Sequence, residues 1–190
     1  LTRINYTFDN RFLFTFTARA DGSSKFGSNN KWAFFPSGAF SWKMHEERFI
    51  KDLNVFDMLK IRASYGISGN QGISAYQTLS RYGQHKYFNG GKWVTAIGPG
   101  YQSGYTGQDG IYALWSGIPN KGLKWETTAQ VDLGLDMSFF GNRLNGSFDW
   151  YRKTGKDIFH SMRVDCTSGY TSIVMNYADL KNDGFEINLS

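Results

Sequence analysis

Few residues of the types that perform chemistry stand close together in this sequence. The segment "DIFHS" brings Asp157, His160 and Ser161 together, and "HEER" begins at His45. A nucleophilic site needs hydrogen-bonded geometry between nucleophile, base and orienting group, and closeness along a strand does not provide it. "HEER" lacks the HExxH spacing of a zinc site, and Cys166, the one cysteine, has no metal-ligand spacing around it. We therefore expect no catalytic residue, no metal site and no cofactor.

The charged residues are spread along the chain rather than gathered into a site. The net charge is +5, but Lys and Arg stand singly, which argues against nucleic-acid binding. Asp21 with Gly22 and Asp183 with Gly184 first indicate turns. Calcium binding at an external loop that contains such an aspartate is the alternative.

The composition is compatible with a membrane protein. The 190 residues are 41% hydrophobic and 17% aromatic, yet no apolar run approaches the ~18 residues of a membrane helix. Polar residues on one face of a strand lower its mean hydropathy, so a membrane β-barrel need not contain long apolar runs. The N-terminus shows no charged segment followed by an apolar one, so for an exported protein we expect this chain to be part of something longer.

The segment "LKWETTAQVDLGLDM", residues 123–137, sets apolar residues at odd positions and polar ones at even positions, with Thr127 the single interruption. A period of two predicts a β-strand with one apolar face. Fifteen residues reach roughly 50 Å. Tilted by about 40°, such a strand is taller than the ~25 Å apolar band of an outer-membrane barrel. This length favours a barrel strand that crosses a membrane and projects above it.

Six further segments alternate in the same way, and Pro36 predicts a bulge or local break in the third of them. They are residues 2–8, 11–20, 32–43, 58–68, 143–154 and 180–190. The connections alternate in length: 9–10 and 139–142 are short, 44–57 is intermediate, 21–31 is longer, and about 69–122 and 157–178 are long. Short turns on one rim and long loops on the other are typical of outer-membrane barrels. We predict an all-β fold: an antiparallel transmembrane β-barrel segment of about seven strands, an incomplete barrel with long external loops.

Eight motifs in order along the chain carry a family resemblance. They are "RADGSSKFG" (19–27), "FFPSGAFSW" (34–42), "EERF" (46–49), "LKIRASYGISGNQG" (59–72), "LKWETTAQVDLGLD" (123–136), "NRLNGSFDWY" (142–151), "SGY" (168–170) and "DLKNDGFEI" (179–187). In these the chain resembles the SusC/RagA family of TonB-dependent outer-membrane transporters, in the C-terminal part of their barrel. Residues 73–120 carry no such motif, as expected of variable external loops.

The resemblance implies a 22-stranded barrel in the outer membrane, with a plug domain, a TonB-contacting segment and a SusD-like surface lipoprotein as its lid. We expect residues 1–190 to be one partial barrel domain in contact with outer-membrane lipid, without plug or signal peptide, and TonB to bind a missing N-terminal part. The implied substrate is an oligosaccharide, with an oligopeptide second. No ATP site is expected, because the energy comes through TonB.

The aromatic residues suggest where ligands bind. Aromatic faces beside side-chain amides suit sugar rings and peptides, which makes Trp93, Tyr101, Tyr105 and Trp115 our candidate ligand-binding residues in the loop 69–122. The alternative is packing of the loop on itself or against the lid protein. Aromatics near strand ends are assigned to membrane-interface girdles: Trp32, Trp42, Trp125, Trp150 and Tyr151. Charged residues of the polar faces are assigned to the lumen: Arg19, Arg62, Glu126, Asp132 and Asp136.

Two functions from other classes remain as alternatives. A soluble carbohydrate-binding β-sandwich predicts short strands whose apolar faces are buried against each other. An outer-membrane barrel enzyme requires a converging Ser/His/Asp set or a metal set.

Overall fold

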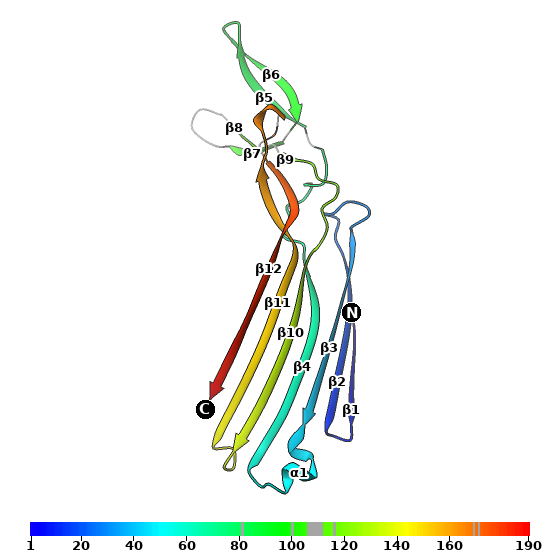
Figure 1. Ribbon diagram of the computed structural model, residues 1–190. Helices are drawn as coiled ribbons and strands as arrows, with labels where there is room; N and C mark the ends of the chain where they lie inside the picture. The colour runs from blue at the N-terminus through cyan, green and yellow to red at the C-terminus, as the bar shows by residue number, and fades with distance from the viewer. Residues whose placement is uncertain (81, 100, 106–111, 116, 169, 171) are drawn as a thin grey trace.

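The computed structural model describes residues 1–80, 82–99, 101–105, 112–115, 117–168, 170 and 172–190. Seven long antiparallel strands lie side by side in one sheet (Figure 1). They are β1 (Thr2–Phe8), β2 (Phe12–Gly22), β3 (Trp32–Lys43), β4 (Phe56–Asn70), β10 (Glu126–Phe139), β11 (Leu144–Arg163) and β12 (Ser172–Leu189). A two-residue strand, β9 (Gly117–Ile118), pairs in parallel with β12. The all-β antiparallel fold is thus confirmed, and among the described residues no pairing joins β1 to β12 to close the sheet.

The connections separate into two ends of the sheet. The end that we call the turn end holds residues 9–11, 44–55 and 140–143, including η1 (Met44–Glu46) and α1 (Arg48–Lys51). The opposite end, the loop end, holds the described residues of the segments 23–31, 71–125 and 164–171, including η2 (Cys166–Ser168). Asp9 and Asn10 both have positive φ, of 49° and 50°, which is the backbone that a tight hairpin turn requires. No helix in the described part of the chain is long and apolar enough to span a membrane.

Cross-strand pairing aligns the side chains into rows of one character. One row crosses all seven long strands and is apolar throughout: Tyr6, Phe14, Phe40, Ala63, Leu133, Trp150 and Phe185. The adjacent row belongs to the other face of the sheet and is mostly polar: Thr7, Leu13, Ser41, Arg62, Gly134, Asp149 and Glu186. The sheet therefore has one apolar and one polar face, as the alternation predicts.

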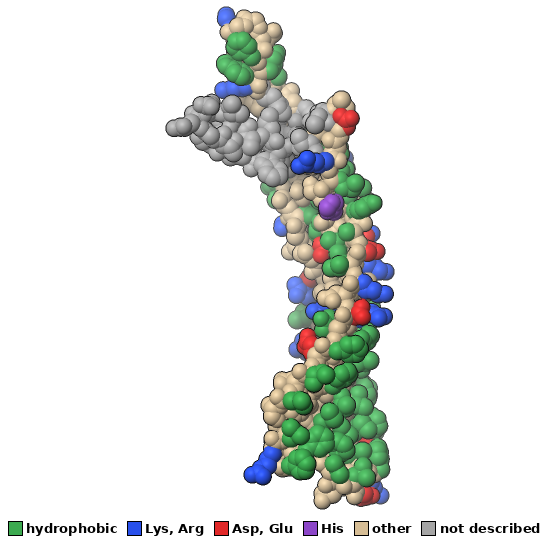
Figure 2. All heavy atoms as spheres, turned by 60° about the vertical axis from the view of Figure 1, so that its left-hand side comes forward, with side chains coloured by type: hydrophobic (Ala, Val, Ile, Leu, Met, Phe, Trp, Pro, Cys, Tyr) green, Lys and Arg blue, Asp and Glu red, His purple; other side chains and the backbone are tan. Residues whose placement is uncertain are grey.

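The apolar face of the long strands is uncovered. Many of its large side chains are exposed, among them Phe16, Leu133, Phe148 and Ile187. Hydrophobic side chains gather over the lower half of one face of the molecule (Figure 2). A sandwich would bury this face against a second sheet, and the described strands contain no such layer, so the β-sandwich alternative is not supported.

The strand bounds differ from the expectation at two places. The strand predicted at 123–137 begins at Glu126 and ends at Phe139, because Leu123 and Trp125 turn away into a small core. The long connection predicted at 157–178 is only residues 164–171, so that prediction was wrong. Register shifts between Gly155 and Phe159, with Asp157 at φ 60°, interrupt the period of two there without ending β11.

Pro36 lies where the neighbouring strands separate. Its pairing with Ala18 of β2 continues without a shift, while the pairs between β3 and β4 stop at Ser37. β3 thus runs through Pro36 without a bulge or an interruption, and only its pairing with β4 ends next to the proline.

A small core forms at the loop end rather than within the sheet. Phe26, Phe35, Ile73, Leu123 and Trp125 are buried together, from three separate segments of the chain. The rings of Phe26 and Trp125 lie 5.2 Å apart, and Phe35 meets Trp125 edge-on at 5.6 Å. This core fixes the bases of the loops to the ends of the long strands.

Candidate ligand and partner surfaces

The segment between β4 and β10 carries a projecting hairpin. β5 (Tyr82–Asn89) and β6 (Lys92–Pro99) pair around Gly90 and Gly91, whose φ angles are +56° and +82°. Phe88 faces Trp93 across the hairpin, with their rings 5.5 Å apart in an edge-on arrangement. "NGG" between two aromatic-rich runs is a hairpin signal that could have located this element from the sequence.

One face of this hairpin presents aromatic and apolar groups to solvent. Register places Tyr82, Gln84, Lys86 and Phe88 of β5 on the same face as Trp93, Thr95 and Ile97 of β6. Trp93 is 69% exposed and Ile97 is 78% exposed. A surface of this kind, aromatic with interspersed polar groups, suits a sugar, a peptide or a partner protein. We call it the hairpin face.

The four candidate ligand residues belong to two different hairpins. Trp93 lies in β6, while Tyr101 and Tyr105 lie in β7 (Tyr101–Tyr105) and Trp115 lies in β8 (Tyr112–Trp115). The register pairs Tyr101 with Trp115, so the backbone brings these two positions opposite each other. The side chains of Tyr101, Tyr105 and Trp115 lie outside the described part of the structure, so their role stays a prediction.

The bases of the loops are tied together by side-chain amides and hydroxyls. Asn30 donates to the carbonyl of Leu123 at 3.2 Å, and Asn120 donates to that of Val174 at 2.9 Å. Thr78 donates to the carbonyl of Lys25 at 3.3 Å. These bonds give side-chain donors to backbone carbonyls of two loop residues and of one residue in β12. The hairpin face therefore projects from a braced base.

An ion cluster crosses three strands on the polar face. Arg62 of β4 donates to both carboxylate oxygens of Asp136 on β10 at 2.8 Å, and to Asp149 on β11 at 2.9 Å. Gly134 makes this possible, because a Cβ there would lie 2.5 Å from the Asp149 carboxylate and 2.8 Å from the guanidinium carbon. We call Arg62, Asp136 and Asp149 the wall cluster. The polar-face assignment of Arg62 and Asp136 is confirmed by the register.

The other predicted polar-face charges also find partners. Asp132 accepts hydrogen bonds from Ser64 at 2.9 Å and from Gln130 at 2.6 Å. Arg19 pairs with Asp21 at 2.7 Å, and Glu126 accepts a hydrogen bond from Asn70 at 3.5 Å. Alternation along the strands gives their face, but not the partners Ser64 and Asn70, which lie on the neighbouring strand β4.

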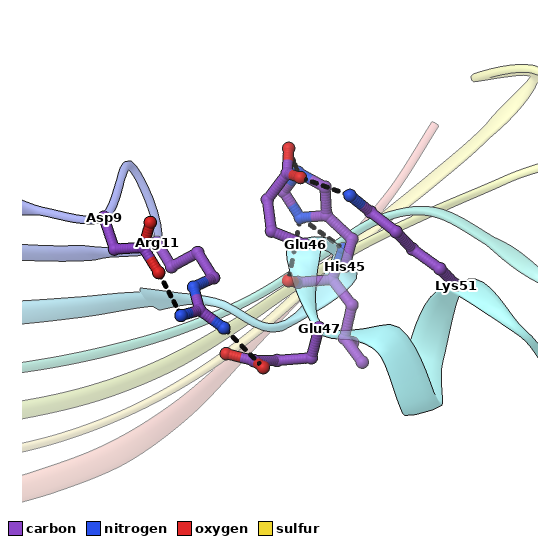
Figure 3. A network of polar contacts seen from close by, with 7 residues as sticks. Asp9, Arg11, His45, Glu46, Glu47 and Lys51 are labelled. Atoms are coloured by element: carbon purple, nitrogen blue, oxygen red, sulfur yellow. Dashed lines mark hydrogen bonds and ion pairs between the residues drawn. The ribbon is translucent and has the colours of Figure 1, made fainter.

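A second polar network holds the turn end in place. Arg11 reaches between Asp9 and Glu47, bonding Glu47 at 2.9 Å (Figure 3). Glu47 also accepts the indole N–H of Trp42 at 3.2 Å. These contacts join the turn before β2 to the turn after β3, at the edge of the apolar face where Trp42 stands.

In the same turn, Lys51 bonds Glu46 at 2.7 Å (Figure 3). This hydrogen bond and the charge of the lysine lower the pKa of the Glu46 carboxyl. His45 contacts the backbone of Leu59 through Nδ1, 3.1 Å from the carbonyl oxygen. His45 thus has a structural partner and is not placed as a metal ligand.

Two of the five predicted girdle residues do not lie on the apolar face of the sheet. Trp125 is buried in the loop-end core, with its indole N–H donating to the carbonyl of Lys31 at 3.3 Å. Tyr151 pairs with Asp132 and Gly184, which puts it on the polar face. Adjacent residues of a strand point to opposite faces, so Trp150 and Tyr151 cannot share an assignment. Trp32, Trp42 and Trp150 lie on the apolar face.

The residues that suggested catalysis do not converge. Asp157 pairs with Lys124 at 2.9 Å, while His160 and Ser161 follow each other along β11 and point to opposite faces. In the residues that the structure describes, no group of three His, Cys, Asp or Glu side chains is placed to hold a metal ion. The Asp-Gly pairs that raised calcium binding lie within β2 and β12 rather than at loop tips.

Comparison with known proteins identifies this arrangement. The family model described as "TonB dependent receptor-like, beta-barrel" matches residues 2–190. TonB-dependent receptor P3 of Formosa agariphila is 40% identical over 188 residues, which cover 99% of this chain and 17% of that protein. TonB-dependent receptor SusC of Bacteroides thetaiotaomicron is 35% identical over 196 residues, covering 99% of this chain and 18% of SusC.

A solved structure agrees with these relatives. The structure of the RagAB peptide transporter superimposes with a TM-score of 0.79 at 28% identity, over 98% of this chain and 19% of that one. The chain spans less than a fifth of the length of each of these proteins. Their names describe receptors and transporters.

Proposed function

Because this chain belongs to the TonB-dependent receptor-like β-barrel family, with SusC and RagAB among its relatives, we propose that its seven long strands form part of the wall of an outer-membrane transporter. The supporting observation is the uncovered two-faced sheet. Its apolar row would lie against acyl chains, while the wall cluster on the other face would meet a watery lumen. The edges of β1 and β12 would pair with other strands of the whole protein, since open edges do not occur in lipid.

The proposed cargo is an oligosaccharide, imported with a SusD-like surface lipoprotein and driven through TonB contacts outside these 190 residues. The relationship to SusC and the aromatic hairpin face support this choice. An oligopeptide is the second candidate, supported by the likeness to the RagAB peptide transporter. Both cargoes offer apolar surface together with hydrogen-bonding groups, as the hairpin face does.

Uptake by whole cells tests the proposal. Cells that lack the full-length gene are compared with complemented cells for uptake of labelled oligosaccharides and labelled peptides, with and without a proton uncoupler. We expect uptake of one class to require both the gene and the proton gradient. Uptake that persists in the deleted strain, or in uncoupled cells, would contradict the transporter assignment.

The hairpin face is proposed as the contact for the cargo or the lipoprotein. Trp93→Ala in the full-length protein removes its largest exposed ring, and Tyr87→Ala on the opposite face of the same hairpin is the matched control. Removing one stacking aromatic typically costs about 1–3 kcal/mol of binding free energy. Cargo affinity is measured by titration calorimetry, and lipoprotein retention is measured by affinity purification.

The two readouts separate the possible contacts. Weaker cargo binding by Trp93→Ala alone assigns the hairpin face to the cargo, and weaker retention of the lipoprotein assigns it to the lid. If both readouts stay at the wild-type level, the aromatic residues only pack the loop, and the contact proposal is wrong.

A further inference from the structure

A polar hollow lies on the polar face, directly below the loop-end core. Its volume is about 290 Å³, and its lining includes Arg19 and Asp21 from β2, Asn70 and Gln71 at the end of β4, and Trp125 before β10. By strand alternation, Arg19, Asp21 and Asn70 share the face of the wall cluster. In the proposed transporter this face lines the lumen, so the hollow would lie just inside the mouth of the pore.

The floor of the hollow is rigid. Trp125 is held by its hydrogen bond to Lys31 and by edge-on packing against Phe35. Gly69 lets the ring of Phe35 lie directly on the β4 backbone, because a Cβ at that position would overlap the ring. Trp125 itself is only 7% exposed, so it backs the hollow as a fixed wall, and a ligand would be held by the polar side chains around it without any rearrangement of the wall.

The polar side chains around the floor keep hydrogen-bonding capacity. Arg19 is paired with Asp21 through Nε, and its side chain is 62% exposed, which leaves the terminal Nη groups accessible. Asn70 and Gln71 are both exposed, and the bond between Asn70 and Glu126 is long, at 3.5 Å. Both donors and acceptors therefore line a space of about 290 Å³.

The balance of charge selects the kind of ligand. Asp21 and Glu126 would repel an anion, whereas Arg19 would repel a cation, and each charge already faces an opposite or polar partner. A neutral molecule with several hydroxyls meets neither penalty, and it uses amide, guanidinium and carboxylate groups together. We propose that this hollow is a subsite for one neutral sugar unit of the cargo, an inference that rests on the proposed function.

The test uses the full-length transporter with its lipoprotein, and Asn70→Ala/Gln71→Ala as the principal variant. Panels of neutral malto-, cello-, xylo- and fructo-oligosaccharides and of mixed tryptic peptides serve as probes in titration calorimetry. Loss of two hydrogen-bonding side chains should weaken binding of the preferred oligosaccharide by about tenfold. Gln130→Ala, on the same face but away from the hollow, is the matched control and should bind as wild type does.

A second variant guards against a folding defect. Asp21→Asn keeps the shape of the side chain but removes the charge that orients Arg19, so it should also weaken sugar binding while the barrel stays compact on unheated gels. Unchanged affinity of both variants, with sugar binding by the wild type, overturns the subsite and leaves the transporter intact. Binding of peptides alone by the wild type overturns the subsite and the oligosaccharide cargo together. Binding of neither panel contradicts the proposed function itself.

Discussion

The substitution Leu133→Arg in the full-length protein tests whether the apolar face meets lipid. Leu133 lies in the middle of β10, within the apolar row that crosses all seven long strands, between Ala63 and Trp150. It is 48% exposed, so about half of its surface is not covered by protein. An arginine on the lipid face near mid-bilayer destabilises a barrel by about 2–4 kcal/mol. At a water-facing site the same change would stay within about 0.5 kcal/mol.

The matched control is Ile97→Arg on the hairpin face. Both changes replace an exposed aliphatic side chain of a strand with arginine, but Ile97 projects at the loop end. The free energy of unfolding is measured by urea titration of the protein folded into lipid vesicles. We expect a loss of about 2–4 kcal/mol for Leu133→Arg and almost none for Ile97→Arg. Equal, near-zero losses would refute the assignment of the apolar face to acyl chains.

Three further results are expected. Gly134→Ala should destabilise the barrel by about 1–3 kcal/mol, since its Cβ would lie 2.5 Å from the Asp149 carboxylate, while Gly38→Ala, with 4.0 Å to its nearest neighbour, should be near neutral in the same urea titration. Lys51→Met removes the partner that lowers the pKa of the Glu46 carboxyl. A carboxyl whose pKa is lowered on folding stabilises the fold at pH values above its ordinary pKa. The variant should therefore have a lower Tm than wild type at pH 7, and this difference should disappear below about pH 4. Residues 1–190 alone in detergent should lack the compact, heat-resistant form of a closed barrel on unheated gels, because two edges stay open.

The period of two in the sequence predicted most of the sheet. It failed where the backbone departs from regular strand geometry. Alternation located the strands β2, β3, β4 and β10. No second sheet packs on these strands, so each has one apolar and one polar face, and its sequence alternates accordingly. At Asp157 a register shift with positive φ interrupts the pattern, so the predicted strand for β11 ended too early and the predicted strand for β12 began too late. Trp125 continues the pattern in sequence, yet it precedes the strand and turns into the core.

The candidate sites were less accessible to sequence reasoning. Alternation gave the face of Arg62 and of Asp136, which are 74 residues apart, but it could not give the register that makes them partners. The role of Gly134 depends on the same register, since the guanidinium lies over its Cα from the neighbouring strand. The polar hollow combines residues of β2 and β4 with Gln71 and Trp125 from the segments beside the strands, so no local pattern indicates it.

The cross-strand rows show where the proposed lipid contact ends towards the loop end of the sheet. The part of each strand beyond that limit accounts for the unusual length of the strands. One row nearer the loop end, Tyr65 and Val131 are followed across the sheet by Arg152 and Asp183. Arg152 lies 5.3 Å from the Trp150 ring and 4.0 Å from Asp183. A charged pair thus follows the aromatic pair Trp150 and Phe185 on β11 and β12, on the side of the loop end. Because barrel strands tilt by about 35–45°, such a row runs obliquely to the membrane, and the limit of the proposed lipid contact falls at a different cross-strand row on each strand. Beyond Arg152, β11 continues to Arg163, roughly 35 Å further along the strand. In the proposed transporter, one half of these strands would supply a lipid-facing belt, and the other half forms the base from which the hairpin face projects (Figure 1).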